Sequence, residues 1–203
     1  MKAFIISLPD SRRRRISAIS NIQISGLPFE IVDGVDAKKM KPEFLSCQQG
    51  EWGRELLPGE VGCYAAHLRV LQRIVDYDLS WGYVLEDDFC YEPDPKYGLV
   101  EVAEVLPDSF DYITLFKTLR INPKHERISD AGSFWRVREP ECMTTGYIIH
   151  RRFAEFVLDH HAVCAMPVDH LYASLSHVHE CFEVKSPIIG ISPGLGSEIH
   201  DCE

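Results

Sequence analysis

A short apolar run, Trp81-Gly82-Tyr83-Val84-Leu85, gives way abruptly to three consecutive acids, Glu86-Asp87-Asp88. Such a run, bounded by polar residues, has the length of a buried strand. Ahead of it, apolar residues recur at steps of three and four, which indicates an amphipathic helix that packs on a sheet: Val61, Ala65, Leu68, Leu71 and Val75. This order favours an α/β fold, in which ligands bind beyond the carboxyl ends of the strands.

The alternation of strands and helices extends over most of the chain. We expect strands at residues 2–8, 29–32, 81–85, 110–115 and 144–149, and helices after the first strand, at about 61–75 and 96–106, and after residue 149. Residues 36–58 predict a long, partly helical loop, residues 117–139 a polar irregular loop over the cleft, and residues from 186 on an extended tail over the sheet. The sequence therefore predicts one α/β domain over residues 1–203, with a mostly parallel central sheet flanked by helices.

Composition narrows the class of function. The net charge of −10 argues against a nucleic-acid partner, because phosphate binding depends on Lys and Arg. The apolar start, Met1 to Leu8, is too short for a signal peptide or membrane span, so we expect a soluble, cytoplasmic protein. The seven cysteines are odd in number and lack a CxxC pair, and we interpret them as reduced, buried side chains rather than metal ligands or disulfides.

The acidic triplet is the main candidate for chemistry. In an extended chain, residues two apart point to the same side, so Glu86 and Asp88 are expected to converge while Asp87 faces away. Two carboxylates on one face suit Mg²⁺ or Mn²⁺, and Asp87 is a candidate to hold a ribose hydroxyl. The alternative is a solvated turn. Apolar residues on both sides, including Phe89, favour buried acids and hence a cation.

Three further features are weaker candidates. The run Arg12-Arg13-Arg14-Arg15 begins a predicted helix and offers guanidinium groups to phosphate, although most of the run is expected to be a charged helix face. Gly34 permits a sharp exit from the second strand beside a ligand. His67, on the predicted amphipathic helix, is by itself more typical of a structural hydrogen-bonding histidine.

Several segments, taken in order, resemble glycosyltransferase family 25, the bacterial lipooligosaccharide galactosyltransferases and their collagen-modifying relatives. The segments are Ser7-Leu8 with Arg14 and Arg15, Val32-Asp33-Gly34, Gly59-Glu60-Val61-Gly62-Cys63, Ala66-His67, Leu85-Glu86-Asp87-Asp88, Thr145-Gly146-Tyr147-Ile148-Ile149 and Pro167-Val168-Asp169. The chain departs from the family pattern where Ser7 replaces Asn and Ala66 replaces Ser, and it is short between Leu115 and Cys142.

The resemblance implies a GT-A fold and an inverting transfer from a UDP-sugar, commonly UDP-galactose, to a saccharide or lipid-linked glycan acceptor at the inner membrane surface, with at most peripheral membrane association. The candidate donor-binding residues are then Leu8, Arg14, Asp33, Gly34 and Asp87, and Glu86 and Asp88 are the candidate ligands of Mn²⁺ or Mg²⁺. His200, in the tail, is a candidate third ligand, as tail histidines are in other metal-dependent transferases.

An inverting transfer also needs a base, for which Asp169 is the first candidate, Glu60 the second, and His67 a further catalytic candidate. Helix capping is an equally weighted interpretation of Asp169 and Glu60. Two other functions remain open at this point. One is a metal-dependent phosphohydrolase of nucleotide sugars that uses the same acids, and the other is a non-catalytic glycan-binding relative.

Overall fold

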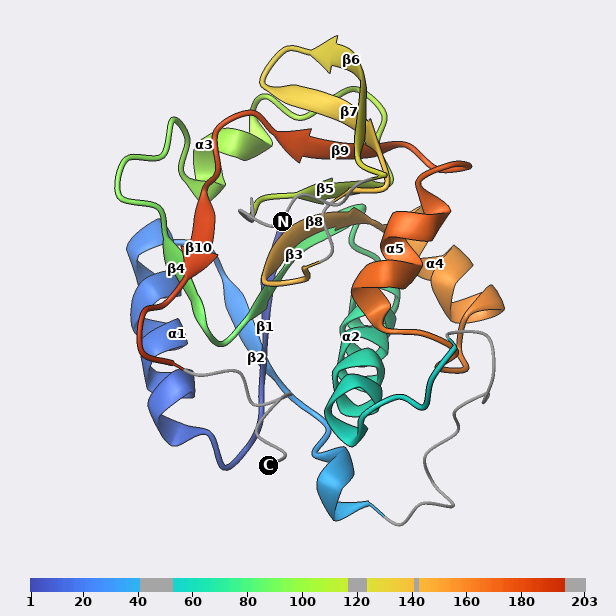
Figure 1. Ribbon diagram of the computed structural model, residues 1–203. Helices are drawn as coiled ribbons and strands as arrows, with labels where there is room; N and C mark the ends of the chain where they lie inside the picture. Colours follow the sequence, from blue (N-terminus) through green and yellow to red (C-terminus); the bar gives the residue numbers. More distant parts are fainter. Residues whose placement is uncertain (41–52, 117–123, 141–142, 196–203) are drawn as a thin grey trace.

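The computed structural model describes residues 1–40, 53–116, 124–140 and 143–195. At its centre lies an eight-stranded sheet (Figure 1). In spatial order its strands are β2 (Phe29–Asp33), β1 (Ala3–Ser7), β3 (Trp81–Glu86), β8 (Gly146–His150), β5 (Tyr112–Thr114), β9 (Cys181–Val184), β7 (Phe134–Arg138) and β6 (Glu126–Ala131). Following the pairings across the sheet, six strands run in the direction of β1, and only β8 and β7 run against it. The expected α/β architecture with a mostly parallel sheet is confirmed.

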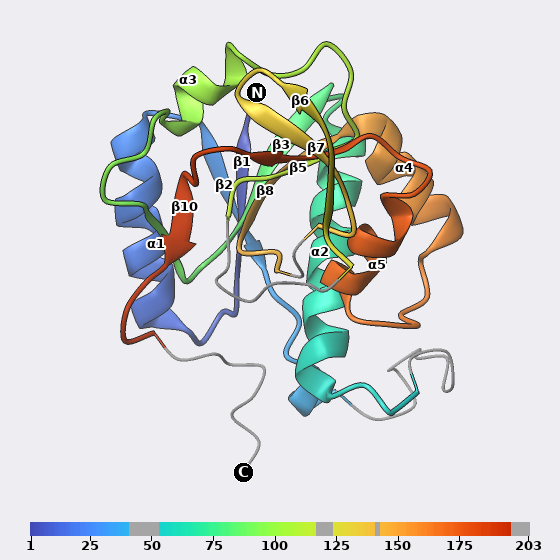
Figure 2. The ribbon, with the colours of Figure 1, turned by 45° about the horizontal axis from the view of Figure 1, so that its top comes forward.

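Helices cover both faces of this sheet. They are α1 (Arg12–Ser25), α2 (Pro58–Asp76), α3 (Leu99–Ala103), α4 (Arg151–His160) and α5 (Val168–Leu175), with a short 3-10 turn, η1 (Ala37–Lys39). In Figure 2, α1 and α3 lie on one side of the sheet, and α2, α4 and α5 on the other. Among the described residues, no helix combines the length and hydropathy needed to cross a bilayer.

Each face of the sheet carries its own hydrophobic core. Phe4 and Val84 pack with α2, α4 and α5, whereas their neighbours Ile5 and Leu85 pack with α1 and α3, and all four are fully buried. Successive side chains of a strand point to opposite faces, so a strand covered on both sides must be apolar at nearly every position. This is why the strand-forming runs at the start of the chain and at residues 81–85 could be recognised from sequence.

Beyond the main sheet, a two-stranded sheet pairs β4 (Phe89–Tyr91) with β10 (Ile189–Ile191) in antiparallel fashion. The chain turns at Asp87 and Asp88 between β3 and β4, and the amide N–H of Ser192 donates to the carbonyl oxygen of Asp88 at 2.7 Å. The segment after residue 186, expected as an extended tail over the main sheet, instead contributes β10 to this second sheet and holds the turn through Ser192.

The prediction of an irregular loop at residues 117–139 is wrong over its second half, where β6 and β7 form a hairpin at the edge of the sheet. Phe134 and Val137 of β7 are buried, but β6 is exposed along most of its length. An exposed edge strand needs no apolar pattern, so the sequence carried no signal for it. Residues 117–123, and residues 41–52 of the other predicted loop, lie outside the described ranges.

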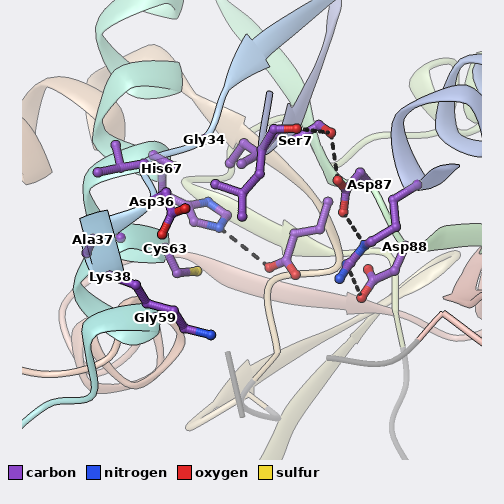
Figure 3. A pocket seen from close by; sticks show the side chains of 17 residues that line it. Ser7, Gly34, Asp36, Ala37, Lys38, Gly59, Cys63, His67, Asp87 and Asp88 are labelled. Carbon is purple, nitrogen blue, oxygen red and sulfur yellow. Dashed lines mark hydrogen bonds and ion pairs between the residues drawn. The ribbon is translucent and has the colours of Figure 1, made fainter. Parts of the chain in front are cut away.

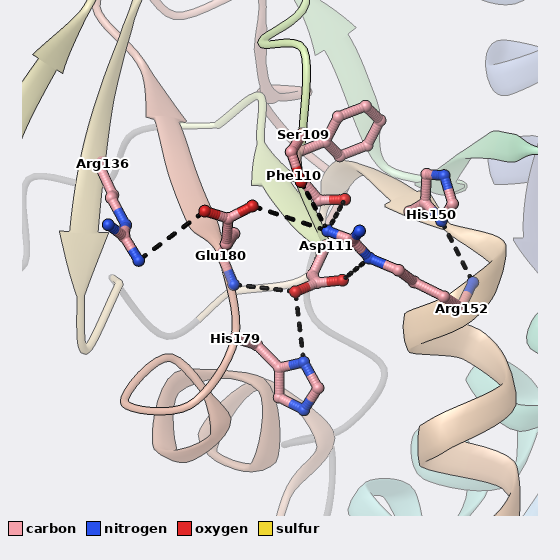
Figure 4. A network of polar contacts seen from close by, with 8 residues as sticks. All are labelled: Ser109, Phe110, Asp111, Arg136, His150, Arg152, His179 and Glu180. Atoms are coloured by element: carbon pink, nitrogen blue, oxygen red, sulfur yellow. Dashed lines mark hydrogen bonds and ion pairs between the residues drawn. The ribbon is translucent and has the colours of Figure 1, made fainter.

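A polar network joins α4 to the far half of the sheet (Figure 4). The buried carboxylate of Asp111 accepts hydrogen bonds from Arg152 Nε at 2.5 Å and from the backbone N–H of Glu180 at 2.9 Å. His179 Nδ1 lies 3.3 Å from the same carboxylate. These contacts tie the start of β5 to the start of α4 and to the segment that enters β9.

Candidate functional site

A cavity of about 270 Å³ lies at the edge of the sheet where the parallel strands β1, β2 and β3 end (Figure 3). Its walls come from five places: the end of β1, the first turn of α1, the loop after β2, the first half of α2 and the acidic turn after β3. The lining residues that matter below are Ser7, Leu8, Arg14, Gly34, Asp36, Cys63, His67, Glu86, Asp87 and Asp88. The triplet, which the sequence placed at a ligand-binding edge, does line a cavity there.

Arg14 links the two aspartates of the triplet. Its Nε lies 2.7 Å from Asp87 Oδ1 and its Nη2 lies 2.8 Å from Asp88 Oδ2, and all three side chains are nearly buried. Ser7 Oγ donates a 2.7 Å hydrogen bond to Asp87 Oδ2. The predicted convergence of Glu86 with Asp88 is therefore not what the structure shows. The chain turns at residues 87 and 88, and the alternation of an extended strand stops at Glu86.

Glu86 also lines the cavity, and it belongs to a separate group of side chains. Thr144 Oγ1 donates to Glu86 Oε1 at 2.6 Å, and His67 Nε2 lies 3.5 Å from the same oxygen. The ring of His67 is fully buried, and its Nδ1 lies 2.7 Å from the hydroxyl oxygen of Tyr147. One donor atom from each of Cys63, His67 and Glu86 lies within 4.8 Å of the others.

Burial and charge shift the acidity of these groups. Burial, together with the nearby charge of Glu86, raises the pKa of Asp88 to about 7, against the opposing effect of Arg14. Burial also raises the pKa of Glu86, but its contacts with His67 and Thr144 outweigh burial and hold that pKa below its usual value. Asp88 Oδ1 is buried and has no hydrogen-bond partner among the described residues. A buried carboxylate oxygen without a partner is costly, so this atom favours a ligand or cation.

Of the other predicted donor-site residues, two line the cavity and one does not. Leu8 and Gly34 line the cavity, and the amide N–H of Gly34 donates to Ser7 O at 2.8 Å, which joins the ends of β1 and β2. Asp33 is not among the lining residues, because its carboxylate points outward, 61% exposed, and pairs with Arg15 at 2.8 Å. Asp36, which the sequence did not single out, lines the cavity in its place.

The predicted base Asp169 lies in the first turn of α5 and is not among the lining residues. Burial raises the pKa of Asp169, and the charge of Glu86 raises it further. Its Oδ1 accepts the backbone N–H of His170 at 2.9 Å. Pro167, not Asp169, occupies the N-cap position of α5, so the capping interpretation of Asp169 does not hold.

Glu60 has its carboxylate fully engaged at the start of α2. Arg54 donates to both oxygens, at 2.6 and 2.8 Å, and the backbone N–H of Leu57 donates to Oε2 at 2.8 Å. The bond from the N–H of Leu57 is the glutamate half of a capping box, and the Leu57 side chain has no acceptor to complete the motif. Glu60 does not line the cavity. The geometry therefore favours the capping role over the catalytic one. The predicted metal ligand His200 lies outside the described residues.

Sequence reasoning missed Cys63, Thr144 and Tyr147 as members of the site. Cys63 and His67 are four residues apart on a predicted helix, and that spacing places two side chains on one face. The pairing was therefore available from the sequence. Thr144 and Tyr147 reach Glu86 and His67 only through the antiparallel pairing of β8 with β3, which the sequence did not reveal.

Comparisons with known proteins agree with this geometry. The sequence model of the family "Glycosyltransferase family 25 (LPS biosynthesis protein)" matches residues 1–172 of this chain. The lacto-N-neotetraose biosynthesis glycosyltransferase LgtE of Neisseria gonorrhoeae is 26% identical over 213 residues, covering 98% of this chain and 75% of LgtE. The "probable inactive glycosyltransferase 25 family member 3" of Bos taurus is 31% identical over 144 residues, covering 63% of this chain. The chain spans only 23% of the length of that mammalian relative.

Two solved structures match much of the chain at low sequence identity. A197 from STIV has a TM-score of 0.48 at 14% identity, covering 90% of this chain and 80% of its own. A glycosyltransferase involved in the glycosylation of the major capsid of PBCV-1 has a TM-score of 0.41 at 11% identity, covering 87% and 66%. These scores are too low to assign a fold. The family model covers most of the chain and includes the whole cavity, and on this match the chain belongs to glycosyltransferase family 25.

Proposed function

We propose that this chain is an inverting glycosyltransferase that moves a sugar from a UDP-sugar to a saccharide acceptor of lipooligosaccharide or another glycan. Galactose is the first candidate for the sugar, and Mn²⁺ or Mg²⁺ assists the transfer. One observation carries the proposal. The acidic turn, Arg14, Leu8 and Gly34 meet in a single cavity where three parallel strands end. The match to LgtE, a lacto-N-neotetraose biosynthesis glycosyltransferase, covers 98% of this chain and supports the same class of reaction.

The cavity suits part of a nucleotide sugar. Its volume of about 270 Å³ is close to the lower end of small-molecule sites, roughly 300 Å³. The polar wall at Asp87 and Asp88 would face the ribose and diphosphate, and the backbone at Leu8 and Gly34 would flank the nucleoside. Arg14 balances the two aspartates before any ligand binds, so an incoming diphosphate meets a wall that is not strongly repulsive.

The acids also fit a hard divalent ion. Asp88 Oδ1 is a buried carboxylate oxygen that lacks a hydrogen-bond partner among the described residues, and Glu86 supplies a second carboxylate in the same cavity. Oxygen ligands of this kind suit Mn²⁺ and Mg²⁺. When bound, such an ion supplies Lewis-acid stabilisation of the departing diphosphate.

Asp169 is the proposed base. In the transfer, the acceptor oxygen bonds to the anomeric carbon, the bond from that carbon to the diphosphate oxygen breaks, and the acceptor proton passes to the carboxylate. The raised pKa of Asp169 makes it a better proton acceptor than an ordinary aspartate. Both carboxylate oxygens of Glu60 are engaged by Arg54, and one of them also by Leu57, which argues against Glu60 as the base.

The test is a transfer assay with UDP-galactose, Mn²⁺ and a panel of saccharides, following UDP release and, by NMR, the anomeric configuration of the product. The proposal predicts acceptor-dependent UDP release and an inverted linkage. Release at the same rate without acceptor would favour the phosphohydrolase, and saccharide binding without nucleotide binding would favour the non-catalytic relative. Asp169→Asn is expected to abolish transfer and keep UDP binding, whereas Asp159→Asn, at an exposed position of α4, leaves both unchanged.

A further inference from the structure

The thiol of Cys63 faces the cavity, and the proposed transfer makes no use of it. Cys63 and His67 lie one helical turn apart on α2 (Figure 3), and Glu86 is the last residue of β3. Their sulfur, nitrogen and oxygen donor atoms all lie within 4.8 Å of one another. A thiol, an imidazole and a carboxylate offer one soft sulfur ligand beside nitrogen and oxygen ligands, unlike the oxygen-only pair of Asp88 and Glu86 in the proposed transfer.

The spacing of the donor atoms matches a tetrahedral ion. Bonds of about 2.0–2.1 Å to nitrogen and oxygen, at a tetrahedral angle, place those two ligand atoms about 3.4 Å apart. His67 Nε2 lies 3.5 Å from Glu86 Oε1. At that separation the two atoms are too far apart for a good hydrogen bond, but they are well placed to share an ion.

An independent observation points to a ligand at the same place. His67 is fully buried, and its Nε2 has no hydrogen-bond partner among the described residues. Its other ring nitrogen is held by the hydroxyl of Tyr147 at 2.7 Å, which fixes the plane of the ring. Thr144 fixes Glu86 in the same way, at 2.6 Å. Metal-binding histidines and carboxylates are commonly oriented by such outer contacts.

We propose that Cys63 Sγ, His67 Nε2 and the carboxylate of Glu86 bind a thiophilic divalent ion of the Zn²⁺ class, with its fourth coordination position open to the cavity. Three protein ligands and one open position are typical of zinc sites that exchange a small ligand. Glu86 is shared with the hard-ion site of the proposed transfer, so Zn²⁺ here competes with Mn²⁺ for one carboxylate. Binding of the ion itself does not depend on whether the chain transfers sugar.

The test uses Co²⁺ as a spectroscopic substitute for Zn²⁺ in the purified, reduced, metal-free chain. We expect a thiolate-to-cobalt charge-transfer band in the near ultraviolet and tetrahedral d–d bands in the visible, which saturate at one ion per chain and disappear when Zn²⁺ is added. Cys63→Ser is expected to lose the charge-transfer band. Cys90→Ser, at the partly buried free cysteine of β4, is expected to keep it. No charge-transfer band in the unaltered chain, or a band that survives Cys63→Ser, would overturn the site.

Tyr147→Phe keeps all three ligands and removes only the hydroxyl that holds His67. Loss of such an outer partner typically weakens metal affinity about 10–100-fold. We therefore expect Zn²⁺ affinity, measured by competition with a chromophoric chelator, to fall by that factor in Tyr147→Phe and by more in Cys63→Ser. Melting temperatures without metal show whether each variant is folded. Unchanged affinity in a folded Cys63→Ser variant would refute the proposal whatever the outcome of the transfer assay.

Discussion

Arg14 Nη2 lies 2.8 Å from Asp88 Oδ2, and the same guanidinium reaches Asp87 through Nε at 2.7 Å. Helix α1 is thereby fastened to the turn that follows β3, across 73 residues of sequence. The pairing gives two nearly buried carboxylates a counter-charge within the protein itself. The acidic turn is consequently a preformed wall of the cavity and not a solvated loop.

Removal of Arg14 should therefore destabilise the fold. Arg14→Ala leaves Asp87 and Asp88 buried without their cation, and breaking a buried ion pair on one side costs about 3–5 kcal/mol. We expect a loss of that order in the free energy of unfolding, measured with urea. Arg13→Ala is the matched control, because Arg13 is exposed on the same helix. Equal effects of the two substitutions would show that the ion pairs add nothing specific.

Close packing at Gly62 predicts a second effect. A Cβ added there would lie 2.2 Å from the carbonyl oxygen of Val35, so the loop after β2 would have to move away from α2. Overpacking of this kind costs about 1–3 kcal/mol. Gly62→Ala is expected to lower stability by that amount and to weaken UDP binding in calorimetry. Gln72→Ala, on the exposed side of α2, should change neither beyond about 0.5 kcal/mol.

The sequence predicted the elements whose pattern is set by two-sided burial or by helical spacing. β1, β3 and α2 fall within a residue or so of their expected positions, apart from the start of α2 at Pro58. The edge hairpin of β6 and β7 was missed because exposed strands need no apolar pattern. β9, only four residues long, was missed although it is fully buried, since so short a run is ambiguous.

For the site, the sequence pointed to the acidic triplet and to Arg14, but it did not show which of the three acids pairs with Arg14. The turn at Asp87 sends two acids to Arg14 and leaves Glu86 with His67, and only the backbone path decides this. The interpretation of the cysteines as non-ligands rested on the absence of a local motif. The group formed by Cys63, His67 and Glu86 combines a helix face with a strand end, which motif spacing does not detect.

The Asp111 network predicts a pH-dependent contribution to stability. Burial raises the pKa of Asp111, but the backbone N–H of Glu180 and the guanidinium of Arg152 outweigh burial and hold it below the usual value of 3.8. A carboxyl whose pKa is lowered by folding stabilises the fold above its unfolded pKa, and that contribution is lost as pH falls through the folded pKa.

Asp111→Asn should therefore cost roughly 1–3 kcal/mol near neutral pH, a range that allows for the half-exposed Arg152. The difference between Asp111→Asn and the unaltered chain should shrink as the pH is lowered below about 4. Urea unfolding over a series of pH values measures it, with the exposed Asp108→Asn as control. A stability difference that stays constant as the pH falls well below 4 would contradict an ionised Asp111 in the folded chain.

The most direct test of the nucleotide-sugar site is the melting temperature of the chain with and without UDP and Mn²⁺, compared with GDP and CMP. Ligand at a hundred times its Kd adds about 2.7 kcal/mol, which for a chain of this size corresponds to roughly 5–10 °C. We predict a shift of that order with UDP and Mn²⁺ that is lost in Asp88→Asn and kept in Asp108→Asn. No UDP-dependent shift in the unaltered chain, or an undiminished shift in Asp88→Asn, would contradict the proposed site.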